Sequence, residues 1–144
     1  MLITGHSLGA AAANLLGAYI NGEFYGDLRI PQRDLYVYTF ATPRTFFPDG
    51  KVPQTSSSTN IFNFLVRSSN SDLVDPVTIV PSDSRHEWQR FGRMAVLTTM
   101  KTSGKMLDHH DMQNYIDAIV YKIHNNESIS LSIDKLDDQI YTCK

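Results

Sequence analysis

The sequence has little cysteine, no long apolar run and no excess of basic charge. Its one cysteine, Cys143, excludes an intrachain disulfide. The longest apolar stretch, residues 8–20, is interrupted by Asn14 and is too short to span a bilayer, so no integral membrane segment is expected. Thirteen Lys and Arg against fifteen Asp and Glu give a net charge of −2 without a basic stripe. Nucleic acid is therefore not an expected partner.

Internal repeats, low-complexity tracts and linkers are lacking as well. The 144 residues are 42% hydrophobic and 19% charged, which is typical of a globular protein with a real core. We therefore expect residues 1–144 to belong to one domain. The composition does not predict an oligomeric state or a cellular location.

Apolar patterning predicts strands and helices in alternation. The expected strands are residues 2–4, 34–40, 60–66 and 94–99, with an edge strand within 128–133. A helix apolar on nearly every face is expected over residues 8–20. A second helix should bury one face, made of Met112, Tyr115, Ile116, Ile119, Val120 and Ile123. This order indicates an α/β fold, with a mostly parallel sheet and flanking helices.

The strongest chemical signal is Gly5-His6-Ser7-Leu8-Gly9, which lies between the first strand and the first helix. G-x-S-x-G in that context is the nucleophile elbow of serine hydrolases, and it predicts Ser7 as the nucleophile. The turn is tight, so we expect side chains at positions 5 and 9 to collide. The helix directs its free N–H groups toward Ser7, which makes the Leu8 N–H a candidate oxyanion donor.

A serine nucleophile needs a base, and the sequence has five histidines: His6, His86, His109, His110 and His124. The first lies inside the elbow and should flank Ser7, while positions 86 and 124 are those of surface histidines. The adjacent pair at 109 and 110 opens the second helix, where the dipole disfavours imidazolium and helps to keep a ring basic.

Two alternatives exist for the segment Asp108-His109-His110-Asp111. It could be a polar helix start with Asp108 as the N-cap. It could also bind a metal, although adjacent side chains point in different directions and no second ligand cluster is present.

The acid that orients the base should lie between residues 8 and 109, because α/β-hydrolases use the order Ser, Asp or Glu, His. Asp72 and Asp75 are the candidates, since both follow the strand ending at residue 66. Either could instead be an ordinary turn aspartate.

Five segments, in order, resemble the class 3 (triacylglycerol) lipase family. They are Thr4–Gly9 around the nucleophile, Tyr38–Arg44 (YTFATPR), Asp75-Pro76-Val77 with Pro81, Trp88 with Arg90-Phe91-Gly92, and His110–Tyr115 (HDMQNY). Asp72-Leu73-Val74 also resembles the acid motif. A further departure is Ala10, where the family commonly has a second glycine.

The resemblance implies Ser7 as nucleophile, His110 as base and Asp75 as the orienting acid. It implies an α/β-hydrolase fold, a lipid-like acyl ester as substrate, and no cofactor or metal. Family members carry strands, a lid helix and an oxyanion loop before the elbow, so the chain is expected to be an N-terminally truncated member. The alternatives are a phospholipase or soluble-ester esterase with the same triad, or a non-catalytic hydrolase-like fragment.

Overall fold

A single sheet organises the structure, a computed structural model that describes residues 1–22, 30–46, 58–69, 74–82, 88–99 and 106–133. Its strands lie in sequence order, β1-β2-β3-β4-β5. The first four pair in parallel and β5 pairs antiparallel to β4. The strands are β1 (Leu2–His6), β2 (Tyr36–Phe40), β3 (Ile61–Ser68), β4 (Arg93–Thr99) and β5 (Ser132–Ile133). The α/β fold with a mostly parallel sheet is therefore confirmed.

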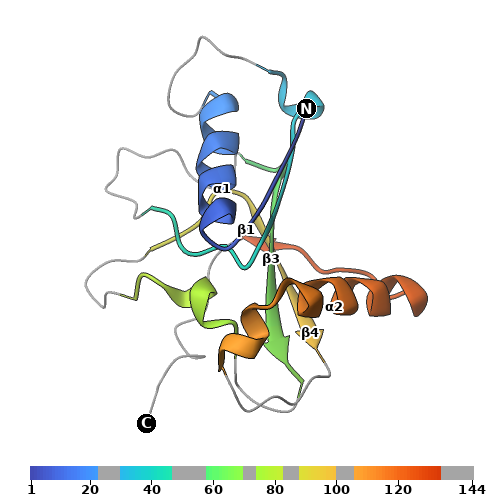
Figure 1. The fold of residues 1–144 in the computed structure, drawn as a ribbon. Coiled ribbons are helices and arrows are strands. Elements are labelled where there is room, and N and C mark those ends of the chain that lie inside the picture. The colour runs from blue at the N-terminus through green and yellow to red at the C-terminus, as the bar shows by residue number, and fades with distance from the viewer. Residues whose placement is uncertain (23–29, 47–57, 70–73, 83–87, 100–105, 134–144) are drawn as a thin grey trace.

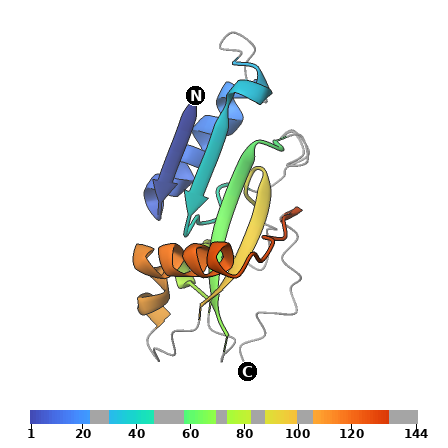
Figure 2. The same cartoon turned by 90° about the vertical axis from the view of Figure 1, so that its right-hand side faces the viewer.

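Two helices cover opposite faces of this sheet. Helix α1 (Leu8–Ile20) packs on β1 and β2, and α2 (Met112–His124) packs on β3 and β4. In Figure 1 the two helices lie to either side of the strands, and in Figure 2 α2 crosses in front of the sheet while α1 lies behind it. The four parallel strands run in the same direction, so their carboxyl ends lie at one edge of the sheet.

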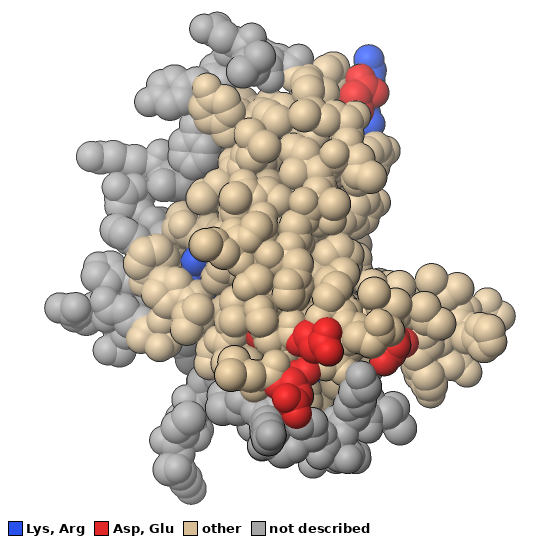
Figure 3. Space-filling model, viewed as in Figure 1, with Lys and Arg blue, Asp and Glu red and all other residues tan. Residues whose placement is uncertain are grey.

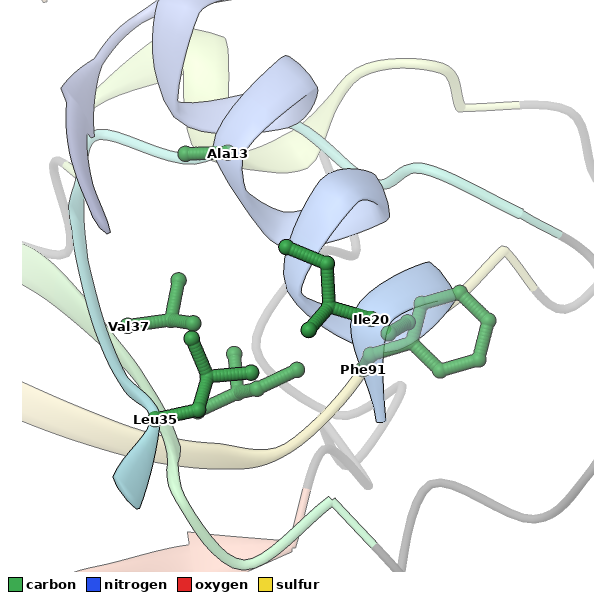
Figure 4. Close-up of a cluster of buried hydrophobic side chains, with 7 residues drawn as sticks. Ala13, Ile20, Leu35, Val37 and Phe91 are labelled. Atoms are coloured by element: carbon green, nitrogen blue, oxygen red, sulfur yellow. The ribbon is translucent and has the colours of Figure 1, made fainter. Parts of the chain in front are cut away.

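The core beneath α1 is built mainly from small and branched aliphatic side chains, together with the ring of Phe91. Figure 4 shows this cluster, whose buried members are Ala13, Ala18, Ile20, Leu35, Val37, Ile61 and Phe91. Gly17 sets the helix close to the sheet, since a Cβ at that position would lie 2.6 Å from Cγ2 of Val37. Helix α1 is apolar on nearly every face, as predicted. One face packs on the sheet, whereas Leu15, Leu16 and Tyr19 are partly exposed.

The face of α2 that packs on the sheet is only in part the predicted one, since Met112 and Ile119 pack against the core as expected. Tyr115 is fully buried as expected, and so is Ala118, but Ile116, Val120 and Ile123 are exposed. The apolar face of α2 is wider than its contact with β3 and β4, so only the part centred on Tyr115 and Ala118 is buried. None of the helices in the described ranges is both long and apolar enough to cross a membrane.

Candidate active site

The turn between β1 and α1 holds Ser7 in a strained conformation. Its φ of 59° and ψ of −128° lie in a region of backbone conformation that residues other than glycine rarely adopt. The backbone N–H of Ser7 donates to the Phe40 carbonyl at the end of β2 (3.0 Å). The strand pairing therefore helps to hold the serine at the carboxyl edge of the sheet.

The two glycines of the elbow differ in how much space surrounds them. A Cβ at Gly5 would lie 2.3 Å from the carbonyl oxygen of Gly9, a clash that neither backbone segment can relieve. A Cβ at Gly9 meets no atom of the described residues within 4 Å. The predicted collision is therefore found at position 5 and not at position 9.

The side chain of Ser7 points away from its own helix. Ser7 is the N-cap residue of α1, yet its hydroxyl makes no capping hydrogen bond. The Oγ atom lies instead 2.9 Å from Nε2 of His110, which is 103 residues away in the chain. A serine that would ordinarily stabilise a helix start is thus directed toward a histidine.

The other ring nitrogen of His110 faces Asp75. Its Nδ1 atom lies 3.0 Å from Oδ2 and 3.1 Å from Oδ1 of that carboxylate. A carboxylate only accepts hydrogen bonds, so the neutral ring carries its proton on Nδ1. The lone pair on Nε2 then accepts the Ser7 hydroxyl proton. The structure therefore brings Ser7, His110 and Asp75 together in one hydrogen-bonded series.

Two further donors hold the Asp75 carboxylate, which is fully buried. Asp75 caps the 3-10 helix η3 (Pro76–Ile79), accepting the Val77 N–H on Oδ1 at 3.0 Å. The Tyr115 hydroxyl donates to Oδ2 at 2.6 Å. Burial, followed by the charge of Asp75 and this hydrogen bond, raises the pKa of Tyr115 far above its ordinary range. Tyr115 therefore stays protonated and remains a donor.

A buried arginine supports the same loop from behind. Arg90 is fully buried, and its Nε donates to the Thr42 carbonyl at 2.7 Å. Its Nη2 donates to the carbonyl of Thr78, a residue of η3 whose hydroxyl in turn donates to the Asp75 carbonyl. One planar guanidinium thus ties the segment after β2 to the segment that carries the carboxylate.

The remaining candidates from the sequence lie elsewhere. His109 is buried, and neither of its ring nitrogens has a hydrogen-bond partner among the described residues. His124 is exposed at the end of α2. Asp72 and His86 fall outside the described residues.

The alternative in which Asp108 is the N-cap of the second helix is not what the structure shows. Asp111, rather than Asp108, is the N-cap of α2 and accepts the Gln113 N–H at 3.0 Å. His109 and His110 instead end the 3-10 helix η4 (Met106–His110), which precedes α2. The ring of His110 therefore leaves the chain at a bend between two helical segments.

The Leu8 N–H follows Ser7, the predicted nucleophile, at the start of α1. The first helical donors to the Ser7 carbonyl are the N–H groups of Ala10 (2.9 Å) and Ala11 (3.2 Å), which follow Leu8 in the chain. The Leu8 N–H belongs to the first turn, whose donors have no partner within the helix. A negatively charged oxygen beside Ser7 would meet the positive end of the α1 dipole.

The surface around His110 is acidic and partly apolar. Figure 3 shows acidic side chains gathered over η4 and α2, and the exposed carboxylates there include Asp108 on η4, Asp111 between the two elements and Asp117 on α2. Leu107, also on η4, and Leu8, which follows Ser7, are 72% and 79% exposed. Over the described ranges, no three His, Cys, Asp or Glu side chains are grouped as a metal site would require.

The sequence did not predict the contacts that three residues make around this series. Tyr115 was assigned to an apolar helix face, and Arg90 was noted only as part of a resemblance. His6 was expected to flank the nucleophile, but its Nε2 lies 2.9 Å from the backbone carbonyl of His110. A buried tyrosine or arginine needs a polar partner, and this requirement was the one signal in the sequence that could have indicated the contacts of Tyr115 and Arg90.

Comparison with known protein families identifies the chain with a lipase family. The family model described as lipase (class 3) matches residues 1–84, which include the elbow, Asp75 and η3. None of the curated proteins matches the chain.

Proposed function

The chain belongs to the class 3 lipase family, and we propose that it is a serine carboxylic ester hydrolase that cleaves acylglycerol-type esters through an acyl-enzyme intermediate. The observation that carries this proposal is the series from Ser7 Oγ to His110 Nε2 (2.9 Å) and from His110 Nδ1 to Asp75 (3.0 Å). It has the connectivity of a nucleophile, a base and an orienting acid.

In the proposed acylation step, Ser7 Oγ attacks the ester carbonyl carbon while His110 Nε2 takes the hydroxyl proton. Asp75 keeps the His110 proton on Nδ1 and stabilises the imidazolium that forms. The negative charge on the carbonyl oxygen is stabilised by the Leu8 N–H and the α1 dipole. When the carbon–oxygen bond to the alcohol breaks, His110 returns the proton to the departing oxygen.

Deacylation repeats these steps with water. His110 takes a proton from the water as its oxygen attacks the acyl carbon, and the second tetrahedral species forms beside Leu8. Collapse breaks the bond to Ser7 Oγ, which recovers its proton from His110, and the fatty acid leaves. The residues named here supply every proton transfer, so the proposed route includes no cofactor.

The surroundings of the reacting residues support a neutral, lipid-like ester. Leu8 and Leu107 offer exposed apolar surface beside Ser7 and His110, which suits an acyl chain. Exposed carboxylates at Asp108 and Asp111 repel anionic head groups, and salt screens that repulsion. Neutral acylglycerols therefore fit this surface better than anionic phospholipids do.

Replacement of the reacting residues tests the proposal. Ser7→Ala and His110→Ala should each lower kcat by about 10⁴-fold or more, and the double variant should be scarcely worse, because the residues act as a unit. A fluorophosphonate probe should label the wild-type protein at Ser7 and leave Ser7→Ala unlabelled. Full activity of Ser7→Ala, or strictly additive losses, would contradict the proposed mechanism.

Substrate class needs a separate comparison. Emulsified neutral acylglycerols, anionic phospholipids and a soluble short-chain ester should be tested on the same preparation, at low and high salt. We expect the neutral acylglycerols to be cleaved fastest, and we expect salt to raise the rate on anionic substrates more than on neutral ones. Faster cleavage of the soluble ester would instead indicate an esterase.

A further inference from the structure

We propose that His6 is a positioning residue for His110, and that it acts through a hydrogen bond to the His110 main chain. His6 ends β1 and directly precedes Ser7, yet its side chain reaches a residue 104 positions away. This inference rests on the proposed function, since the positioned ring is the base of that reaction.

The direction of the hydrogen bond follows from its partner. The His6 Nε2 atom lies 2.9 Å from the His110 carbonyl oxygen, and a carbonyl oxygen only accepts, so Nε2 carries the proton and donates. His110 is the last residue of η4, and a single residue, Asp111, separates it from α2. Carbonyl groups at the end of a helical segment have no partner within it. His6 supplies the donor that this bend would otherwise lack.

The ring of His6 also packs on the ring it positions. The imidazole centroids of His6 and His110 are 4.8 Å apart with the planes inclined by 31°. On its other contact, His6 meets the Tyr115 ring edge-on at 6.2 Å. Tyr115 holds Asp75, so the three contacts of His6 all bear on groups that fix the place of the His110 ring.

These contacts bear on turnover rather than on substrate binding. The His110 ring must keep Nδ1 at Asp75 and Nε2 at Ser7 while a proton moves onto Nε2. A displacement of a reacting group by about 1 Å can cost about 100-fold in rate. Because His6 holds both the backbone and one face of the ring, its loss should let the base shift while Ser7 and the acyl site remain.

Two substitutions separate the hydrogen bond from the ring. His6→Gln keeps an amide N–H at the same number of bonds from Cα but removes the aromatic ring. His6→Phe keeps a ring against His110 and Tyr115 but has no donor. His124→Phe is the matched control, since His124 is exposed at the far end of α2.

Each variant is measured in the same way. Steady-state kinetics gives kcat and KM, thermal unfolding gives Tm, and proton NMR records the low-field resonance of a histidine N–H bonded to a carboxylate. The resonance reports on the His110–Asp75 hydrogen bond and does not require turnover. It therefore distinguishes failure of this inference from failure of the proposed function.

We expect His6→Phe to lower kcat about tenfold with KM changed by less than about twofold, and to broaden the low-field resonance through solvent exchange. His6→Gln should recover most of the turnover and keep the resonance sharp. His6→Phe with wild-type kcat and resonance would overturn the inference. An equal loss of kcat in His6→Phe and His6→Gln that parallels their loss of Tm would also overturn it, because that pattern indicates a purely structural role. A wild-type protein with no esterase activity and a His6-dependent resonance would instead end the proposed function and leave the contact to His110 standing.

Discussion

Removal of the Tyr115 hydroxyl tests the account of the buried carboxylate. In Tyr115→Phe the ring remains in the core while Asp75 Oδ2 loses a donor at 2.6 Å. A hydrogen bond to a charged group contributes about 1.5–3 kcal/mol to stability. The free energy of unfolding near neutral pH should therefore fall by about that amount. Turnover should fall less than about tenfold, because Val77 and His110 still bind Asp75.

The same variant should change how stability depends on pH. The pKa of Tyr115 is raised in the folded protein, whereas an unfolded tyrosine titrates near its ordinary value of about 10. Above about pH 10 the unfolded chain loses this proton and the folded protein keeps it, so the unfolded state binds fewer protons. The stabilisation is thus fully present below about pH 10 and is lost by about 1.4 kcal/mol for each pH unit above it.

Chemical denaturation at about pH 8 and about pH 11 measures both effects. The stability difference between wild type and Tyr115→Phe should shrink by about 1.4 kcal/mol at the higher pH. Tyr36→Phe, at a half-exposed tyrosine of β2, is the control and should change stability by less than about 0.5 kcal/mol. Equal stability of wild type and Tyr115→Phe near neutral pH, or a difference that does not shrink in alkali, would refute the reasoning.

Three further predictions use matched pairs of variants. Asp75→Asn should lower kcat by about 10⁴-fold because His110 takes the wrong tautomer, while Asp72→Asn should change kcat little. Steady-state kinetics on the two folded variants tests this, and the reverse result would assign the orienting acid to Asp72. Gly5→Ala should lower the free energy of unfolding by about 1–3 kcal/mol because its Cβ meets the Gly9 carbonyl, whereas Gly9→Ala should be neutral or stabilising by about 0.5 kcal/mol. Thermal unfolding tests this, and equal Tm values for the two variants would disprove the expected difference in stability. Arg90→Met should lower the free energy of unfolding by about 2–4 kcal/mol because two carbonyl groups lose the guanidinium donor, whereas Arg93→Lys, at an exposed position of β4, should lower it by less than about 0.5 kcal/mol. Denaturant midpoints test this, and a small effect of Arg90→Met would contradict it.

Local sequence signals predicted the elements around the nucleophile well. The helix over residues 8–20 has the predicted bounds, because an apolar run between a Gly-Ser turn and Asn21-Gly22 carries its own start and stop signals. The strand expected at 60–66 instead runs from Ile61 to Ser68, since its end is set by pairing with β4 rather than by composition. Boundaries that depend on a neighbouring strand are not contained in the local pattern.

Periodicity located α2 and predicted only part of its buried side. Ile116, Val120 and Ile123 fit an apolar stripe, and yet they are exposed, while the sector around Tyr115 packs on the sheet. A stripe of apolar residues shows that a helix is amphipathic. The position of the strands beneath it decides which part of the stripe is covered.

For the candidate site, the sequence by itself determined the chemistry of the residues, and the tertiary structure decided their distances. Gly5-His6-Ser7 and its flanking elements predicted Ser7 as the nucleophile, because the elbow is a local structure formed by neighbouring residues. His110 and Asp75 were singled out by resemblance, and their catalytic roles stay predictions. Their nearness to Ser7 depends on parallel strands that bring residues 103 positions apart to one edge of the sheet. The contact of His6 with the His110 carbonyl has no local signal, because it exists only once β1 and the bend before α2 lie side by side.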